Sequence, residues 1–391
     1  MRAGGSSVYR LDPGPGCGAP AYRSKVPTTP GGGRFQKTTH KEFIGTAVLP
    51  PPRFLCCLMA AAADMSGESD ESDESDESDG LAESDSSSKH AALHEPVMVS
   101  EALKYLGLAP GKIVVDATLG CGQHARHIIP AILPGGLLIG IDRDPQMLRI
   151  AQSELAQFPR ESYRIFEAAY TRLEDVLEEV GIAKVDAILL DAGFSSAQMD
   201  DPARGFSYRI DGPLDMRYSP DATSAADLVN QLPAESLEKI FREYGEERWS
   251  RRIAERLVRE RRKGPILRTV RLAEIILCAV PRGRHKLHPA RRCFQALRIA
   301  ANRELEQIEK FLPSALSRLR LNGRMVVISY HSLEDRLVKR AFQAGKAEGR
   351  LRIETKRVAR PEPDEVARNA RSRSARLRAA TALSWPRTGG A

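Results

Sequence analysis

The sequence of 391 residues lacks the marks of a membrane-spanning or disulfide-bonded protein. Its longest apolar run, residues 54–63, has ten residues, whereas roughly 18 are needed to cross a bilayer. Its six cysteines are scattered, with no pair at CxxC spacing, so we expect neither a disulfide framework nor a zinc or other metal site. Hydrophobic residues make up 42% of the chain, which is enough for a packed core and excludes wholesale disorder.

Charge divides the chain into three regions. Residues 1–63 hold eight Lys and Arg against two acids, residues 64–89 hold eleven acids and one Lys, and residues 90–391 hold fifty basic and thirty-eight acidic residues. An acid-poor, arginine-bearing start is typical of an organellar transit peptide, and the alternative is that translation starts at Met59 or Met65. The Glu-Ser-Asp repeat of Glu68–Asp79 is typical of a solvated linker. The excess of basic residues in the last region suits a polyanionic partner.

From His94 on, short apolar strands alternate with helical stretches, a pattern that predicts βαβ units around a parallel sheet. The clearest strands are residues 112–116, 137–141, 185–190 and 323–330. The long stretch between the last two has apolar residues at helical spacing, which predicts an inserted helical subdomain. The basic chain after Phe342 reads as a flexible arm or a nucleic-acid contact.

These patterns predict five segments along the chain. Residues 1–93 are a disordered extension, and residues 346–391 are a basic tail. Between them, residues 94–203 and 301–345 form the two parts of an α/β domain, and residues 204–300 form a helical insert between those parts.

A glycine-rich turn follows the first strand, and an acid ends the second. Glycines let a backbone approach a ligand closely, and a carboxylate 20–25 residues further on can hold two ribose hydroxyls. Asp116, Gly120, Gly122 and Asp142 meet this pattern. The third glycine of a dinucleotide turn is missing, so a nucleoside ligand without phosphates, such as S-adenosylmethionine, fits better. An ordinary turn with a surface aspartate is the alternative.

Polar residues also follow the later strands. Asp191 ends the third strand, and Ser195 and Ser196 after it are either ligand contacts or helix N-caps. His331 follows the fourth strand as a general base or a structural hydrogen-bonder, and Ser332 has the spacing of a capping box with Asp335.

Two other features favour contact with nucleic acid. The loop 204–217 carries aromatic and arginine side chains, on which a splayed-out base stacks. Residues 248–263 and 291–298 crowd arginines together without evident balancing acids, which favours contact with phosphates.

Together these stretches resemble the RsmH (MraW) methyltransferases. The resemblance runs in the right order over about three quarters of the chain. It comprises His94–Val97, Gly140–Pro145, Arg204–Ser207, Asp211–Arg217, Tyr244–Arg248, Phe294–Ile299, His331–Arg336 and Asn369–Arg378. It implies an α/β fold of the class I (Rossmann-like) methyltransferase type with an inserted helical subdomain.

The resemblance also implies an activity and a partner. The family uses S-adenosylmethionine to methylate the exocyclic N4 of a cytidine in small-subunit ribosomal RNA, and the substrate is the RNA or the small subunit. By resemblance, the cofactor contacts fall on Gly122, Gln123, His124, Asp142, Tyr170, Asp191 and Gln198. No membrane partner is implied, and monomer and homodimer both stay open.

The chain departs from the family at three of its positions. The family usually has Gly, Phe and Leu where this chain has Gln123, Tyr170 and Ala192. The combination resembles the mitochondrial branch that acts on 12S rRNA, so we expect a location in the mitochondrial matrix, with the cytoplasm as the alternative. The Gln123 side chain would crowd the cofactor's methionine part, which keeps open a non-catalytic RNA-binding assembly factor. A nicotinamide-dependent oxidoreductase is disfavoured by the incomplete glycine pattern.

The implied reaction needs little acid–base machinery. A sulfonium methyl is already activated, so the enzyme must align N4, methyl and sulfur and exclude water. An acceptor for the amino hydrogens would help to free the N4 lone pair. The candidates are Asp191, Asp215 and backbone carbonyls near Gly193, and the sequence does not choose among them.

Overall fold

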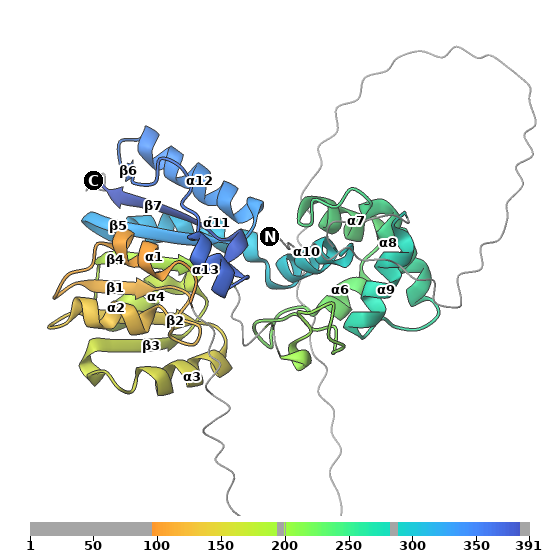
Figure 1. Ribbon diagram of the computed structural model, residues 1–391, viewed down its shortest axis with the longest axis horizontal. Helices are drawn as coiled ribbons and strands as arrows, with labels where there is room; N and C mark the ends of the chain where they lie inside the picture. The colour runs from red at the N-terminus through yellow and green to blue at the C-terminus, as the bar shows by residue number, and fades with distance from the viewer. Residues whose placement is uncertain (1–95, 194–198, 200, 282–287, 384–391) are drawn as a thin grey trace, which may run out of the picture. The chain divides into compact units, whose positions relative to one another are not determined.

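Seven strands form one mixed sheet in the order β3-β2-β1-β4-β5-β7-β6 (Figure 1). The computed structural model describes residues 96–193, 199, 201–281 and 288–383. The strands are β1 (Ile113–Asp116), β2 (Leu137–Asp142), β3 (Tyr163–Glu167), β4 (Val185–Asp191), β5 (Leu319–Ser329), β6 (Leu351–Ile353) and β7 (Arg376–Ala382). Strands β1 to β5 pair in parallel, whereas β7 runs antiparallel to both of its neighbours, β5 and β6.

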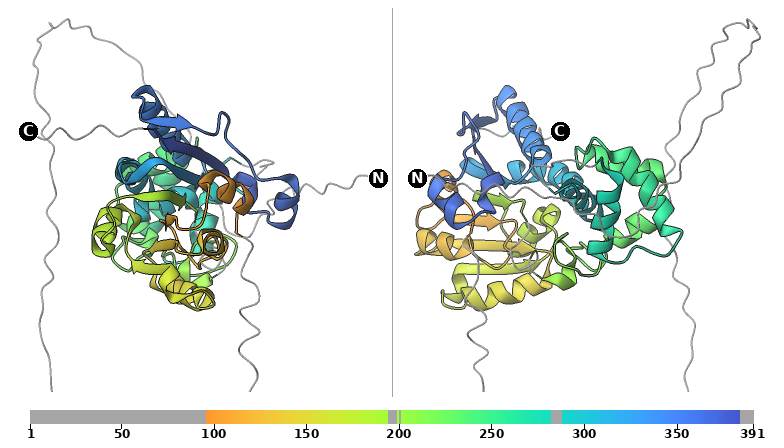
Figure 2. Two further views of the ribbon diagram at one scale, coloured as in Figure 1. Left: turned by 90° about the vertical axis from the view of Figure 1, so that its left-hand side faces the viewer. Right: turned by 45° about the vertical axis from the view of Figure 1, so that its right-hand side comes forward.

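Helices cover both faces of the sheet because successive strand residues point to opposite sides. In β1, Val114 packs into one apolar cluster and Val115 into another. The first cluster contains residues of α1 (Val99–Leu106), α2 (Ala125–Ile132) and α3 (Pro145–Leu155). The second contains residues of α4 (Leu173–Val180), α11 (Glu304–Ser317) and α12 (Ser332–Ala347). Figure 2 shows the sheet between these two helical layers.

Five of the described helices between β4 and β5 share an apolar cluster of their own, whereas α11, which also precedes β5, packs on the sheet. The five are α6 (Ala225–Gln231), α7 (Ala234–Glu243), α8 (Ser250–Arg261), α9 (Thr269–Ala279) and α10 (Ala290–Asn302). Phe241 and Leu257 are fully buried in this cluster. The helices lie in the stretch for which the sequence predicts a helical subdomain. None of the described helices is long and apolar enough to span a membrane.

The four strands predicted from the sequence are confirmed, but three others were missed. The predicted four are apolar along most of their length, since both of their faces are covered. β3 is an edge strand with only Tyr163 buried, and β6 has three residues, so neither carries a strong pattern.

The expectation of a flexible basic arm after residue 345 is wrong for the described residues. That segment contains β6, α13 (Pro363–Arg368) and β7, and β7 lies inside the sheet. Arg378 on β7 donates two hydrogen bonds to the Asp335 carboxylate, at 2.7 and 3.1 Å. Arg376 and Arg378 alternate with the buried Leu377 and Ala379, so the positive charge masked the period-two pattern at the start of the strand.

This strand order, with one antiparallel strand inserted beside the last parallel one, is that of the class I methyltransferase fold. The fold expected from the sequence is therefore confirmed.

The Arg378–Asp335 pair gives a test of the attachment of β7. Both side chains are mostly buried, so we expect Arg378→Ala to lower the free energy of unfolding by about 1–3 kcal/mol. Asp335→Ala should cost a similar amount, and the double variant less than the sum. Urea denaturation of the four proteins measures this coupling. Arg352→Ala, which removes an exposed ion pair with Glu354, is the control and should cost less than about 1 kcal/mol.

Asp116, at the end of β1, is a buried acid with an incomplete set of partners. Its side chain is 1% exposed, and Oδ1 accepts a hydrogen bond from the Thr118 N–H at 3.2 Å. Oδ2 has no hydrogen-bond partner among the described residues. Burial raises the pKa of Asp116 to about 7, and the nearby charges of Asp191 and Asp142 add to the effect, against the Thr118 hydrogen bond.

This raised pKa predicts a loss of stability with rising pH. The folded protein holds the proton up to about pH 7, whereas the unfolded chain releases it near the ordinary pKa of 3.8. The stability that the bound proton confers is therefore lost as pH rises from about 4 through about 7. Asp116→Asn should remove this loss, because asparagine does not titrate. The unfolding free energy of the variant relative to that of the parent should therefore increase between pH 5 and pH 8, by about 1 kcal/mol or more. Urea denaturation at both pH values measures it. An equal pH dependence in parent and variant would contradict the prediction, and Asp221→Asn, at an exposed acid, is the control.

Candidate active site

A cavity of about 900 Å³ lies at the carboxyl edge of the parallel strands. Its walls come from the segments after the five parallel strands β1 to β5, from the helical insert, and from residues 369–374. Ligand sites in open α/β sheets lie at this edge, because the loops that follow parallel strands converge there. The volume is in the range of small-molecule sites.

The turn after β1 has the left-handed backbone that its glycines predict. Gly120 and Gly122 have φ of 53° and 80°. The Gly120 N–H donates to Asp142 Oδ2 at 2.8 Å, which ties the turn to the end of β2. A Cβ on Gly122 would lie 3.5 Å from Ala151 and Leu155 of α3, so this residue faces the helix. Gly122 is thus the one described residue of the predicted cofactor set that does not line the cavity.

Gln123 and His124 line the cavity at the start of α2. Gln123 Nε2 is buried without a hydrogen-bond partner among the described residues, so it is a donor that a ligand can satisfy. His124 Nε2 lies 3.1 Å from the Val97 carbonyl oxygen, which can only accept, so this nitrogen carries a proton. Burial lowers the pKa of His124 and so favours the neutral ring. The nearby Asp191 charge opposes this effect but does not reverse it.

Asp142, at the end of β2, and Tyr170, shortly after β3, line the cavity. Each Asp142 carboxylate oxygen accepts one backbone N–H, from Gly120 at 2.8 Å and from Asp144 at 2.9 Å. Each oxygen keeps a lone pair for a ligand hydroxyl. Burial raises the pKa of Asp142 in spite of these bonds. The Tyr170 ring packs edge-on against Phe311 at a centroid distance of 5.0 Å.

Asp191, at the end of β4, lies among three polar neighbours. Its Oδ1 accepts the Gly193 N–H at 3.2 Å, and its Oδ2 accepts the Tyr330 hydroxyl at 3.3 Å. His124 Nδ1 lies 4.0 Å from Oδ2. Burial raises the pKa of Asp191, and the interaction with His124 opposes that rise. Gln198, Ser195 and Ser196, which follow in the sequence, lie outside the described residues.

Asp215, the other predicted acceptor, is not part of the cavity wall. The Arg217 guanidinium donates to both of its oxygens, at 2.7 and 2.9 Å. Burial would raise the pKa of Asp215, but these hydrogen bonds lower it. Of the two predicted aspartates, only Asp191 is therefore available to a ligand.

The loop 204–217 reaches the cavity through its aromatic side chains. Phe206 lines the wall and stacks on Tyr218 at 5.5 Å, and the Arg143 guanidinium covers the Tyr218 ring at 4.4 Å. Arg204 donates to the buried Asp144 at 2.7 Å, which anchors the loop to the turn after β2.

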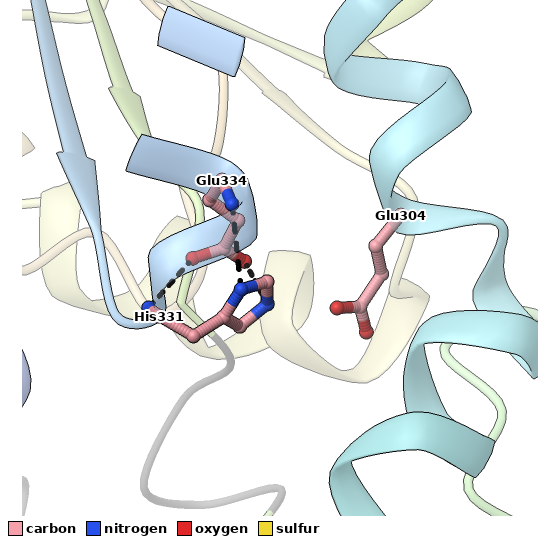
Figure 3. A group of neighbouring side chains, drawn as sticks. All are labelled: Glu304, His331 and Glu334. Carbon is pink, nitrogen blue, oxygen red and sulfur yellow. Dashed lines mark hydrogen bonds and ion pairs between the residues drawn. The ribbon is translucent and has the colours of Figure 1, made fainter. Parts of the chain in front are cut away.

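His331 lines the cavity at the start of α12 and caps that helix. The Glu334 carboxylate accepts the His331 N–H, and the Glu334 N–H donates to His331 Nδ1. The capping box predicted from Ser332 and Asp335 is therefore wrong by one residue. Figure 3 shows this pair with Glu304, another buried acid of the cavity wall.

The basic stretch 248–263 is less open to phosphate than its composition suggests. We expected no balancing acids from the sequence, but acidic side chains pair with several of these basic residues in the fold. Glu255 pairs with Arg251, and the buried Glu260 pairs with Arg256, Lys263 and Arg271.

Several cavity residues were not singled out from the sequence. They are Arg143, Glu304, Tyr330, Glu334 and the segment 369–374. Most lie inside stretches quoted for the family resemblance, which was the one available signal. Residues 369–374 were predicted to belong to the basic tail, because nothing in their composition indicates that they line a cavity.

Comparison with known proteins gives the family. The MraW methylase family matches residues 91–383. Ribosomal RNA small subunit methyltransferase H of Geobacter sulfurreducens is 49% identical over 309 residues, which are 74% of this chain and 99% of the relative. The protein of the same name from Acidothermus cellulolyticus is 46% identical over 319 residues, 76% of this chain and 96% of the relative. The chain therefore belongs to the MraW methylase family and is a methyltransferase that uses S-adenosylmethionine.

Proposed function

We propose that this chain methylates the exocyclic N4 of a cytidine in small-subunit ribosomal RNA. The observation that carries the proposal is the near-complete alignment with relatives named as ribosomal RNA small subunit methyltransferase H. A cavity that combines nucleoside-type contacts with buried hydrogen-bond acceptors is the structural support.

The cavity residues fit the cofactor. Gln123 Nε2 is a buried donor in need of an acceptor, and it suits the carboxylate of the methionine part. The free lone pairs of Asp142 suit the ribose hydroxyls, and Tyr170 offers an apolar surface to the adenine. The glutamine that replaces the family's usual glycine is therefore a contact and not an obstruction. S-adenosylmethionine supplies the activated methyl group.

Asp191 is the acceptor that prepares the amino group for methylation. A hydrogen bond from N4 to the Asp191 carboxylate weakens the conjugation of the N4 lone pair with the ring. Once N4 has gained the methyl group it must lose one proton, and Asp191 takes it. The raised pKa of Asp191 suits this role, because a stronger base is a better proton acceptor. Tyr330 and Gly193 hold the carboxylate in place.

Exposed arginines at the cavity give the RNA a docking surface. Arg291 on α10 and Arg373 on the segment 369–374 both line the cavity and are exposed. Contacts with phosphates fix the register of a nucleic acid on a protein, while the base itself enters the site.

The activity is tested with the full chain, S-adenosylmethionine, and small-subunit rRNA presented free and within subunits. We expect N4-methylcytidine in the digested RNA by mass spectrometry. Asp142→Ala removes the ribose acceptors and should lower turnover at limiting cofactor by about 100-fold, as loss of a buried charge-assisted contact of 2–3 kcal/mol does. Asp175→Ala, at an exposed acid of α4, should leave turnover unchanged.

Two outcomes would contradict the proposal. Methylation at another atom or on another RNA would show that N4 of a small-subunit rRNA cytidine is not the substrate. Tight RNA binding with no methylation in any form would indicate the non-catalytic assembly factor instead.

We further propose that the substrate is mitochondrial 12S rRNA and that the enzyme supports maturation of the mitochondrial small subunit. The acid-poor, arginine-bearing composition of residues 1–63 supports this location, and the family match begins only at residue 91. A fluorescent protein fused behind residues 1–53 should co-localise with a matrix marker. The same fusion with Arg2, Arg10, Arg23 and Arg34 changed to Glu should stay in the cytosol. Cytosolic fluorescence of the unchanged fusion would disprove the mitochondrial assignment.

A further inference from the structure

Three buried titratable side chains meet in the cavity wall outside the predicted cofactor contacts. Glu304 begins α11, and His331 and Glu334 lie at the start of α12 (Figure 3). One ligand atom from each lies within 4.8 Å of the other two, and all three residues line the cavity. Such a group binds either a cation or a polar ligand.

The charges already present disfavour a cation. The Arg298 guanidinium donates to both Glu304 oxygens, each at 3.0 Å, and Arg298 is only 11% exposed. A divalent ion on Glu304 would lie beside this buried positive charge, and the repulsion would be strong in a site with little water. The occupant is therefore a neutral group with hydrogen-bond donors and acceptors.

The protons of the His331 ring follow from its contacts. The Glu334 N–H donates to Nδ1, so Nδ1 is an acceptor and Nε2 carries the proton of the neutral ring. Nε2 lies 3.0 Å from Glu334 Oε1 but makes no hydrogen bond of good geometry among the described residues. The ring is 8% exposed, so this N–H is a buried donor in the cavity wall that a ligand can satisfy.

Glu334 supplies an acceptor beside that donor. Burial disfavours its charged form, yet the contacts with His331 and Arg298 lower its pKa, so it is a carboxylate at neutral pH. Oε2 accepts the backbone N–H groups of Tyr330 and His331, at 2.8 and 3.3 Å. Within the described part of the chain Oε1 accepts no backbone hydrogen bond, so it is left for a ligand in the cavity, 3.0 Å from the His331 Nε2 donor.

A donor and an acceptor side by side match one edge of cytosine. Cytosine presents an amino donor at N4 next to an acceptor at N3, whereas uracil presents an acceptor next to a donor. We propose that Glu334 Oε1 accepts a hydrogen from the cytosine N4 amino group while His331 Nε2–H donates to N3. The pair rejects uracil, because a buried carboxylate would then face the O4 oxygen.

Tyr330 couples this recognition to methylation. Its backbone N–H donates to Glu334, and its hydroxyl donates to Asp191 at 3.3 Å. One residue thus holds the acceptors for both amino hydrogens, Glu334 on the N3 side and Asp191 on the other. The inference rests on the proposed function, since it names the residues that select the base which that function methylates.

The test compares the parent with Glu334→Gln, His331→Asn and the control Glu309→Gln, which lies on the exposed face of α11. Glutamine turns the acceptor partly into a donor, and asparagine keeps the helix cap but withdraws the imidazole N–H. Binding of S-adenosylmethionine, by calorimetry, reports whether each variant is folded. We expect kcat/KM for rRNA to fall about tenfold or more in both site variants and to stay unchanged in the control.

A second measurement separates recognition from a structural role. Each protein is titrated with two copies of the RNA fragment, carrying cytidine or uridine at the position that the parent methylates. The parent should prefer the cytidine fragment, and both site variants should lose that preference. If a site variant bound the cytidine and uridine fragments more weakly by the same factor, the proposal would be overturned in favour of a structural role. Loss of parent activity in EDTA, with recovery on adding Mg²⁺ or Mn²⁺, would overturn it in favour of a cation site. A parent that methylates no RNA would reject the proposed function, whereas an active parent with unaffected variants would reject only this inference.

Discussion

The burial of carboxylates at one edge of the sheet is the constraint on which the rest of the structure depends. Parallel strands bring their carboxyl ends together, and here those ends carry Asp116, Asp142 and Asp191. Little water reaches them, so backbone N–H groups must satisfy the charges. The left-handed glycines of the first turn supply one such group to Asp142, and the first turn of α12 supplies others to Glu334. The shape of these turns is thus a consequence of the acids that they surround.

The sequence predicts the central strands β1, β2, β4 and β5 well and the outer strands β3, β6 and β7 poorly. A strand covered on both faces must be apolar along its length, and such runs are visible without any structure. β7 is covered too, but its buried Leu377 lies between two arginines and its other buried positions are small residues, so the strand carries no strong apolar pattern. Which charges are neutralised is equally hidden. Glu260 meets Arg271 only because α8 packs against α9, and no local pattern reports that contact.

The candidate site divides in the same way. Asp142 and Asp191 could be predicted because each directly ends a strand, where position in the chain fixes position in space. The Arg298–Glu304 pair and the closeness of His331 to Glu304 depend on the crossing of α10, α11 and α12, which the sequence does not give. By resemblance Gln123 was a predicted cofactor contact, but its size also predicted that it would crowd the cofactor's methionine part. Its unsatisfied buried amide suggests a ligand contact instead, and that became visible only when its neighbours were known.

The placement of β7 has a consequence for how the enzyme is made. The cavity wall at residues 369–374 and the strand between β5 and β6 are both formed by the last part of the described chain. During translation the helical insert can bury its own apolar cluster early. The edge of β5 stays unpaired until β7 has been synthesised. We infer that the growing chain completes the site only after β7 and residues 369–374 have been synthesised. A protein shortened by a late stop codon would lose this strand and the wall together, and would leave an unpaired edge prone to aggregation.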